Sequence, residues 1–263
     1  MAFELNRVLP GVTHIRDAMG VCMTLIEGEN AALLVDTGYG TENVAAFVKT
    51  LIAKPVTVLL THNHHDHVLG ARWFPQDSVL MLEADMEEFP RFTSQEKRQA
   101  VLRQALSKGL DVAQADFMAG EFHYPRAVQP STLDLGGMLV QLIACPGHTP
   151  GSCVLYLPQH RLLITGDDWN PCTWLFFEAA LGVQAYRENV RKLQGLDFTH
   201  VLCSHQLELY PRAMFDAFVN NLTDDVLRAA QPVKIGGNEH IDTRQANVTD
   251  GQILVFDWAK AQI

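Results

Sequence analysis

The chain has 263 residues, 48% of them hydrophobic, and a formal net charge of −10 from 20 Lys and Arg against 30 Asp and Glu. This length can bury a large core and suits one domain over residues 1–263 with two similar halves, about 1–115 and 116–263. Nucleic acid is not an expected partner, because binding a polyanion requires a basic surface. No apolar run approaches the length of a membrane span, so no membrane partner is expected.

The first residues and the cysteines bear on cellular location. Met1–Arg7 contains an acidic residue and no apolar run, which argues against a secretory signal and favours a cytoplasmic protein. The cysteines are scattered and form no Cys-x-x-Cys pair, so we expect reduced, buried thiols. They are Cys22, Cys145, Cys153, Cys172 and Cys203.

Short apolar runs begin the chain at Gly11–Arg16, Val21–Glu27 and Ala31–Val35, and their close spacing predicts an antiparallel meander. Thr41 is the predicted cap of a helix that ends before Pro55. The apolar positions of this helix follow helical spacing and are Val44, Phe47, Val48 and Leu51.

Two further strands are predicted at Val56–Leu60 and Ser78–Leu82, followed by a charged helix over Thr93–Lys108. The helix opens with a capping-box pattern in which Thr93 precedes Glu96, and Gly109 is its natural stop. A helix between core strands indicates an insertion over about residues 84–120. It either covers a cleft as a lid or packs on the surface with no role in binding.

The second half repeats the pattern of the first in outline. Met138–Ala144 and Phe198–Cys203 are predicted strands, and Cys153–Leu157 with Arg161–Thr165 form a predicted hairpin. An amphipathic helix lies between them, with apolar positions Tyr186, Val190 and Leu193.

The tail is predicted to form core elements. A helix begins near Pro211, and Asp250-Gly251 turns a hairpin into the strand Gln252–Trp258. The apolar face expected of this helix comprises Phe215, Phe218, Val219, Leu222 and Val226.

The segment Thr61–His67 directly follows a predicted buried strand and holds four histidines and an aspartate. His62 and His64 are two residues apart, so in extended chain both imidazoles point to one side and can hold one metal ion. Asp66 and His67 follow after the backbone begins to turn, and they face a second point in the cavity. A solvated loop is the alternative, but it suits a lone histidine better than imidazoles grouped with a carboxylate at a strand end. The segment therefore predicts a two-metal site.

Similar residues follow predicted strands later in the chain. The whole series is His62, His64, Asp66, His67, His148, Asp167 and His205. This ordered series resembles the metallo-β-lactamase superfamily, in its general glyoxalase II and lactonase-like group. Val35–Gly38, Pro146–Gly151 and Gly166-Asp167 also resemble accessory motifs of that family. The resemblance covers roughly residues 11–205.

The resemblance implies an α/β (α+β) fold, a four-layer αββα sandwich of two mixed sheets flanked by helices. Its metal site would lie along one edge between the halves. Three ligands would hold a first metal, namely His62, His64 and His148. Three would hold a second, namely Asp66, His67 and His205. Asp167 would bridge the metals, and Asp36 would orient ligands through hydrogen bonds.

The chemistry of such a site is hydrolytic. Two divalent ions about 3.5 to 4 Å apart can share a water and lower its pKa from about 16 toward 7. We therefore expect a metal-dependent hydrolase whose metal-bridging hydroxide cleaves a small-molecule ester, lactone or thioester. The expected ions are two Zn²⁺, with Mn²⁺ or Fe²⁺ as alternatives. Asp167 and Asp66 are the expected catalytic residues, with Asp66 also able to receive a proton.

Other functions of the same fold stay open. A mononuclear iron dioxygenase acting on a sulfur compound would use the same ligand types. A phosphodiesterase or nuclease is a further alternative that the acidic charge disfavours. A non-catalytic scaffold would be expected to show eroded ligands, whereas all seven are intact.

Residues next to the seven candidate ligands, and the other histidines, are expected to have roles other than metal binding. Polar residues flank His205, in Ser204-His205-Gln206, where many relatives have glycines. His65 is predicted to point away from His64, and Asp168 to make a structural hydrogen bond rather than a metal contact. The remaining histidines, expected to be structural or exposed, are His14, His123, His160, His200 and His240.

Residues that follow Asp167 either wall an apolar pocket beside the metals or belong to the core. They are Trp169, Cys172, Trp174, Phe176 and Phe177. If they face the metals, an acyl or aromatic substrate suits the pocket better than a highly charged one.

Overall fold

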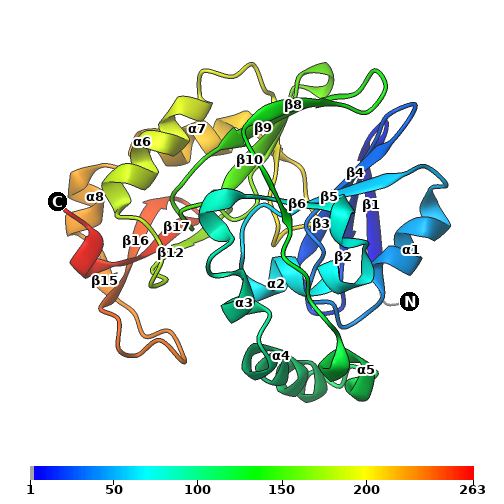
Figure 1. Cartoon of the computed structure of the whole chain (residues 1–263). Helices are drawn as coiled ribbons and strands as arrows, with labels where there is room; N and C mark the ends of the chain where they lie inside the picture. The colour runs from blue at the N-terminus through cyan, green and yellow to red at the C-terminus, as the bar shows by residue number, and fades with distance from the viewer. Residues whose placement is uncertain (1–2) are drawn as a thin grey trace.

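A computed structural model describes residues 3–263. The first of its sheets along the chain is mixed and has seven strands (Figure 1). In the segment Met1–Arg7, whose sequence argues against a secretory signal, Met1 and Ala2 lie outside the described residues. The strands are β1 (Glu4–Leu9), β2 (Val12–Arg16), β3 (Cys22–Glu27), β4 (Ala32–Val35), β5 (Val56–Leu59), β6 (Val79–Leu82) and β7 (Arg126–Val128). β1 to β4 form the predicted antiparallel meander with an added first strand, and β4 to β7 run parallel.

The second sheet has six strands in the order β14-β13-β11-β10-β9-β8. Its strands are β8 (Ser131–Asp134), β9 (Leu139–Ala144), β10 (Cys153–Leu157), β11 (Leu162–Ile164), β13 (His200–Leu202) and β14 (Tyr210–Pro211). β10 and β11 form the predicted hairpin, while β11 and β13 pair in parallel, so this sheet is mixed too.

A third, four-stranded sheet was not predicted. It comprises β12 (Cys172–Leu175), β17 (Gln252–Asp257), β16 (Thr243–Thr249) and β15 (Gln231–Pro232). Only its β16–β17 hairpin was expected, and the turn lies at Asp250-Gly251 as predicted. β12 runs parallel to β17, which is distant in sequence, so local patterns could not reveal the pairing.

Eight α-helices surround the sheets within residues 3–263. They are α1 (Val44–Leu51), α2 (His65–Val68), α3 (Phe89–Phe92), α4 (Gln95–Ser107), α5 (Gln114–Ala119), α6 (Val183–Leu193), α7 (Arg212–Asn221) and α8 (Asp224–Arg228). Short 3-10 turns are η1 (Leu69–Trp73), η2 (Gln76–Ser78), η3 (Glu83–Asp85), η4 (Pro158–His160) and η5 (Trp258–Lys260). None of these helices is long and apolar enough to cross a bilayer.

Three apolar layers hold the two large sheets and the helices together. β4 illustrates the division, because Leu33 faces the second sheet and packs with Leu155, whereas Leu34 faces outward and packs with Val48 of α1. On the far side, α6 and α7 cover the second sheet and also pack against the third. The predicted αββα sandwich is therefore confirmed, with the small third sheet added outside it (Figure 1).

The predicted insertion lies between β6 and β7 and holds η3, α3, α4 and α5. α4 and α5 pack together at one end of the molecule (Figure 1). The first sheet extends past residue 115, because β7 pairs with β6 at Arg126–Val128.

Two predicted caps were wrong. Asn43, not Thr41, caps α1, because its Oδ1 accepts from the Ala46 N–H at 2.9 Å. Ser94, not Thr93, caps α4 by accepting from the Lys97 N–H at 3.3 Å. Thr93 instead lies at the C-terminal end of α3, where its hydroxyl donates to the carbonyl of Phe89, the first residue of that helix. In each case several candidate caps were adjacent, and chain geometry selected among them.

The tail helix is shorter than predicted. α7 ends at Asn221, and Thr223 then caps α8 by accepting from the Val226 N–H at 3.4 Å. Val226 therefore belongs to the next helix, although it packs against the same core. The cysteines are free as expected, but Cys172 is exposed while the other four are buried.

Candidate metal centre

The histidine segment lies where β5 ends and the single-turn helix α2 begins. His62 and His64 are in the non-helical connection, and His64 is extended, with φ −64° and ψ 147°. α2 starts at His65, so Asp66 and His67 turn away to a neighbouring point, as the sequence predicted. One short segment thus places four of the candidate ligands around a buried cavity.

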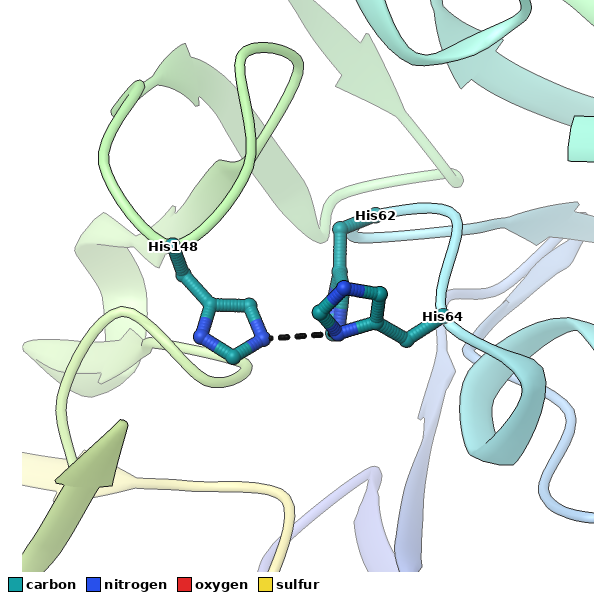
Figure 2. Close-up of side chains that lie close together, drawn as sticks. All are labelled: His62, His64 and His148. Carbon is teal, nitrogen blue, oxygen red and sulfur yellow. Dashed lines mark hydrogen bonds between the residues drawn. The ribbon is translucent and has the colours of Figure 1, made fainter. Parts of the chain in front are cut away.

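Three imidazoles form the first cluster. His148, from the loop after β9, faces His62 and His64, and the His148 Nε2 lies 2.9 Å from the His64 Nδ1 (Figure 2). The three rings are mutually 4.7 Å apart between centroids. All three side chains are buried, and their nitrogens converge as ligands of one tetrahedral cation would.

A second cluster adjoins the first and comprises Asp66, His67 and His205. The Asp66 Oδ2 lies 3.7 Å from the His67 Nε2 and 3.8 Å from the His205 Nε2. Asp167, between β11 and β12, lies where the clusters meet. Its Oδ2 is 3.0 Å from the His205 Nε2, 3.5 Å from the His67 Nε2 and 3.6 Å from the His148 Nε2. The structure therefore brings all seven predicted residues together, with Asp167 in the middle.

Hydrogen bonds on the outer side of the rings fix which nitrogen faces inward. The Thr61 hydroxyl donates to Asp36, so the His62 Nδ1–H donates to the Thr61 Oγ1 at 3.0 Å. The His67 Nδ1–H donates to the Asp36 Oδ2 at 2.9 Å. The His148 Nδ1–H donates to the Trp174 carbonyl at 2.6 Å. In each of these rings the Nε2 therefore faces the cavity as the candidate ligand atom.

The inward atoms fit a cation. Within residues 3–263, the buried His62 Nε2, His67 Nε2 and Asp167 Oδ1 have no hydrogen-bond partner. Buried polar atoms without partners are costly, and metal coordination would satisfy all three. Nitrogen and carboxylate donors of this kind suit zinc and related divalent ions.

Charge in the cluster also suits coordination. Burial, reinforced by the neighbouring imidazoles, lowers the pKa of His62 and of His64 well below the usual value, so both are neutral. Burial opposes ionisation of Asp167, but His205 and His67 outweigh it and hold its pKa well below the usual value. The first cluster thus offers neutral imidazoles beside an ionised carboxylate, the states in which these groups bind metals. In the second cluster burial opposes protonation, but Asp167 and Asp66 raise the pKa of His67 and of His205, so a metal bound there would displace protons from these rings.

Asp36 has the orienting position that the resemblance implied. Besides His67, its carboxylate accepts from the Thr61 backbone N–H at 2.7 Å. Its backbone has φ +62°, a left-handed conformation uncommon for a residue with a side chain. From this strained turn the carboxylate contacts His67 of the second cluster directly and His62 of the first through the Thr61 hydroxyl.

Asp85 was missed by the sequence analysis. This buried carboxylate in η3 accepts from the Asn63 N–H at 3.0 Å, the Thr149 hydroxyl at 2.6 Å and the Gly151 N–H at 2.6 Å. It joins the loop of His62 and His64 to the loop of His148. Its position just after strand β6 is the same signal that marked the other site residues, and it could have been found that way.

His14 is structural, as expected of a lone histidine, but its role bears on the site. The ring accepts at Nδ1 from the Thr24 hydroxyl at 2.9 Å. Its Nε2–H donates to the Cys203 carbonyl at 3.2 Å and the Gln206 carbonyl at 3.1 Å. These carbonyls flank His205, so a residue of the first sheet holds a loop of the second.

The remaining histidines and Asp168 do not join the clusters. His123 and His240 are exposed, and His160 and His200 are partly exposed. Asp168 is buried and belongs to none of the candidate ligand groups, and its Oδ1 has no hydrogen-bond partner among residues 3–263. Its predicted structural hydrogen bond stays a prediction.

A cavity of about 630 Å³ lies beside the clusters. Trp174, Phe177 and Cys172 line it, whereas Trp169 and Phe176 are fully buried in the core. Of the two predicted alternatives, the pocket wall is therefore correct for Trp174, Phe177 and Cys172, and the core is correct for Trp169 and Phe176. His65 also lines the cavity and stands edge-on to Tyr39, with 5.7 Å between the ring centroids. From the insertion, Phe92, Lys97 and Gln104 contribute to the wall.

Residues 17–205 match the Metallo-beta-lactamase superfamily, and the chain belongs to that family. The resemblance inferred from the sequence motifs is thus confirmed. The chain therefore has the metallo-β-lactamase fold, and its buried histidines and aspartates form groups that could hold metal ions.

The relatives are distant. An acyl-coenzyme A thioesterase, MBLAC2, from Gallus gallus is 25% identical over 170 residues, covering 57% of this chain and 59% of the relative. A hydroxyacylglutathione hydrolase from Synechococcus sp. is 27% identical over 173 residues, covering 64% and 56%. These matches span under two thirds of either relative.

Solved structures agree on the fold. A metallo-beta-lactamase from Pontibacter korlensis has a TM-score of 0.56 at 18% identity, covering 81% of this chain and 95% of that one. The sec-alkylsulfatase Pisa1 from Pseudomonas sp. has a TM-score of 0.63 at 17% identity, covering 86% of this chain and 43% of that one.

Proposed function

We propose that the protein hydrolyses a small-molecule ester, lactone or thioester with two divalent metal ions, taken to be Zn²⁺. The observation that supports this most is the position of Asp167, whose carboxylate lies within 3.6 Å of imidazoles from both clusters. One carboxylate shared by two ligand groups is the arrangement that holds a metal pair.

When bound, the metal pair would lower the pKa of a water molecule and polarise the oxygen of the scissile bond. His62, His64 and His148 would hold one ion, and Asp66, His67 and His205 the other. Asp36 accepts the proton on the outer nitrogen of His67 and so orients the inward nitrogen toward this second ion.

Asp66 is a ligand in this proposal rather than an acid. Burial opposes its ionisation, but His67, His65 and His205 lower its pKa to about 2. It is therefore a carboxylate at neutral pH and a weak base, so proton transfer through Asp66 is a minor role.

The cavity wall and the relatives support an ester, lactone or thioester as the bond that is hydrolysed. Trp174 and Phe177 give the wall beside the clusters an apolar surface suited to an acyl or aryl group. One relative is named a thioesterase and another a hydroxyacylglutathione hydrolase, which favours acyl substrates.

The test combines metal content with turnover. We expect about two zinc ions per chain after purification without added metal, and hydrolysis of at least one member of an ester, lactone and thioester panel. A phosphodiester should not be cleaved. About one iron ion per chain without hydrolysis would contradict the proposal and favour oxygen-dependent sulfur chemistry.

A further inference from the structure

The insertion contributes a polar face to the cavity. Lys97 and Gln104 of α4 both line it and are seven residues apart, so they lie on the same side of the helix. Through these two side chains α4 forms part of the cavity wall. The insertion therefore shapes the space in which a substrate would lie.

Phe92 connects this polar face to the metal centre. Its ring centroid is 4.8 Å from that of His64, and the Lys97 Nζ lies 5.8 Å from the same ring. A single aromatic ring thus separates a candidate metal ligand from an ammonium group. An apolar segment of a few carbons lying on Phe92 would reach from one to the other.

Lys97 differs from the other charged groups of the cavity because it has no ion-pair partner among the described residues. Arg91 is paired with Glu178 at 3.0 Å and with Glu88 at 2.9 Å. Asp66 and Asp167 belong to the metal clusters. No carboxylate among residues 3–263 forms an ion pair with Lys97, although its side chain is half-buried in an acidic protein. A half-buried ammonium without a counter-ion is suited to bind an anion.

We propose, building on the hydrolase function, that the substrate carries an anionic group bound by Lys97. Its apolar segment crosses Phe92, and its scissile bond lies at the metal centre. The substrate class is a small acyl compound with a remote carboxylate, sulfate or phosphate. The anion belongs either to the acyl part or to the leaving group.

The test uses matched substrates on the metal-loaded protein. Nitrophenyl hexanoate is neutral, the nitrophenyl monoester of adipate carries the anion on the acyl side, and the hexanoyl ester of hydroxybenzoate carries it on the leaving group. We expect Lys97→Gln to lower kcat/KM for one anionic ester about tenfold and to leave the neutral ester within about twofold. The anionic ester affected identifies the side that Lys97 binds.

Arg103→Gln is the matched control, because Arg103 is an exposed cation of α4 that does not line the cavity. It should leave all three esters within about twofold. An equal loss for neutral and anionic esters in Lys97→Gln, or no loss for any of them, would overturn the proposal.

A binding measurement separates this proposal from the proposed activity. Mercaptohexanoate and mercaptohexanol both offer a thiol to the metals, and only the first has a carboxylate. Calorimetry should show mercaptohexanoate binding about tenfold tighter to the wild type and about equally to Lys97→Gln. If no ester is cleaved, the hydrolase function fails while this pair still tests Lys97. Equal binding of both thiols to the wild type would refute the anion site.

Discussion

The first half of the chain places four candidate ligands within the short segment His62–His67, whereas the second half supplies three that are spread from His148 to His205. The first group is positioned by one strand end and one helical turn. The second comes from three separate loops, each following a different strand. Local geometry is enough to form the first group, but the second depends on the assembled fold.

Residues of the first half also make hydrogen bonds to the loops that carry the second group of ligands. Asp85 binds the loop of His148, and His14 binds the carbonyls on either side of His205. The second group is therefore more sensitive to disturbance than its own sequence suggests. Four substitutions test this difference.

Asp167→Asn should have the largest effect. We expect kcat to fall on the order of 10⁴-fold, because the carboxylate that lies within 3.6 Å of imidazoles from both clusters loses its charge. Circular dichroism should show the fold retained. Asp250→Asn, in an exposed turn, is the control and should leave kcat unchanged. Activity of Asp167→Asn within tenfold of wild type would exclude a bridging role.

His205→Ala should reduce the metal content to about one ion per chain and lower kcat on the order of 10³-fold. The first cluster retains its three imidazoles, so its ion should stay bound. Elemental analysis measures this directly. His200→Ala, on the strand before His205 and outside the clusters, should retain both ions. Loss of both ions from His205→Ala would mean that the two halves do not form separate ligand groups.

Asp85→Ala should lower the free energy of unfolding by about 3 kcal/mol, because three buried donors lose their acceptor. Denaturant unfolding gives the value. Glu83→Ala in the same turn removes an exposed carboxylate and should change stability by less than about 0.5 kcal/mol. A similar result for the two variants would remove Asp85 as the link between the loops.

His14 should make stability depend on pH. Burial lowers its pKa from 6.5 to about 4, so the folded state keeps it neutral where the unfolded state protonates it. Stability is therefore lost as pH falls below 6.5, by about 2 kcal/mol between pH 7 and pH 5.

His14→Gln should reduce the slope of that part of the pH profile, to which the buried His62 and His64 also contribute, measured on metal-free protein so that metal release does not contribute. His123→Gln, which alters an exposed histidine, should retain the wild-type slope. An unchanged slope in His14→Gln would show that protonation elsewhere causes the acid sensitivity.

The sequence predicted the site better than it predicted element boundaries. The spacing of His62, His64, Asp66 and His67 is a property of a few consecutive residues, so it needed no tertiary information. The cap of α1 was assigned to Thr41 instead of Asn43 because both residues can accept a backbone hydrogen bond, and only the chain path decides.

Features that depend on pairing between strands distant in sequence could not be predicted from local patterns. β12 pairs with β17 across the second half of the chain, and that pairing turns Trp174 toward the cavity while Trp169 stays in the core. Lys97 shows no motif in the sequence, because its significance arises only where α4 packs beside the metal clusters.

Trp174 has two roles, one carried by its side chain and the other by its backbone carbonyl. Its indole walls the cavity, while its carbonyl accepts the outer proton of His148 at 2.6 Å. A side-chain change at this position alters the cavity and leaves the carbonyl in place, because β12 is fixed by its ladder with β17. Substitutions at this position, by evolution or in a designed library, can therefore reshape the cavity wall without removing the hydrogen bond that orients His148.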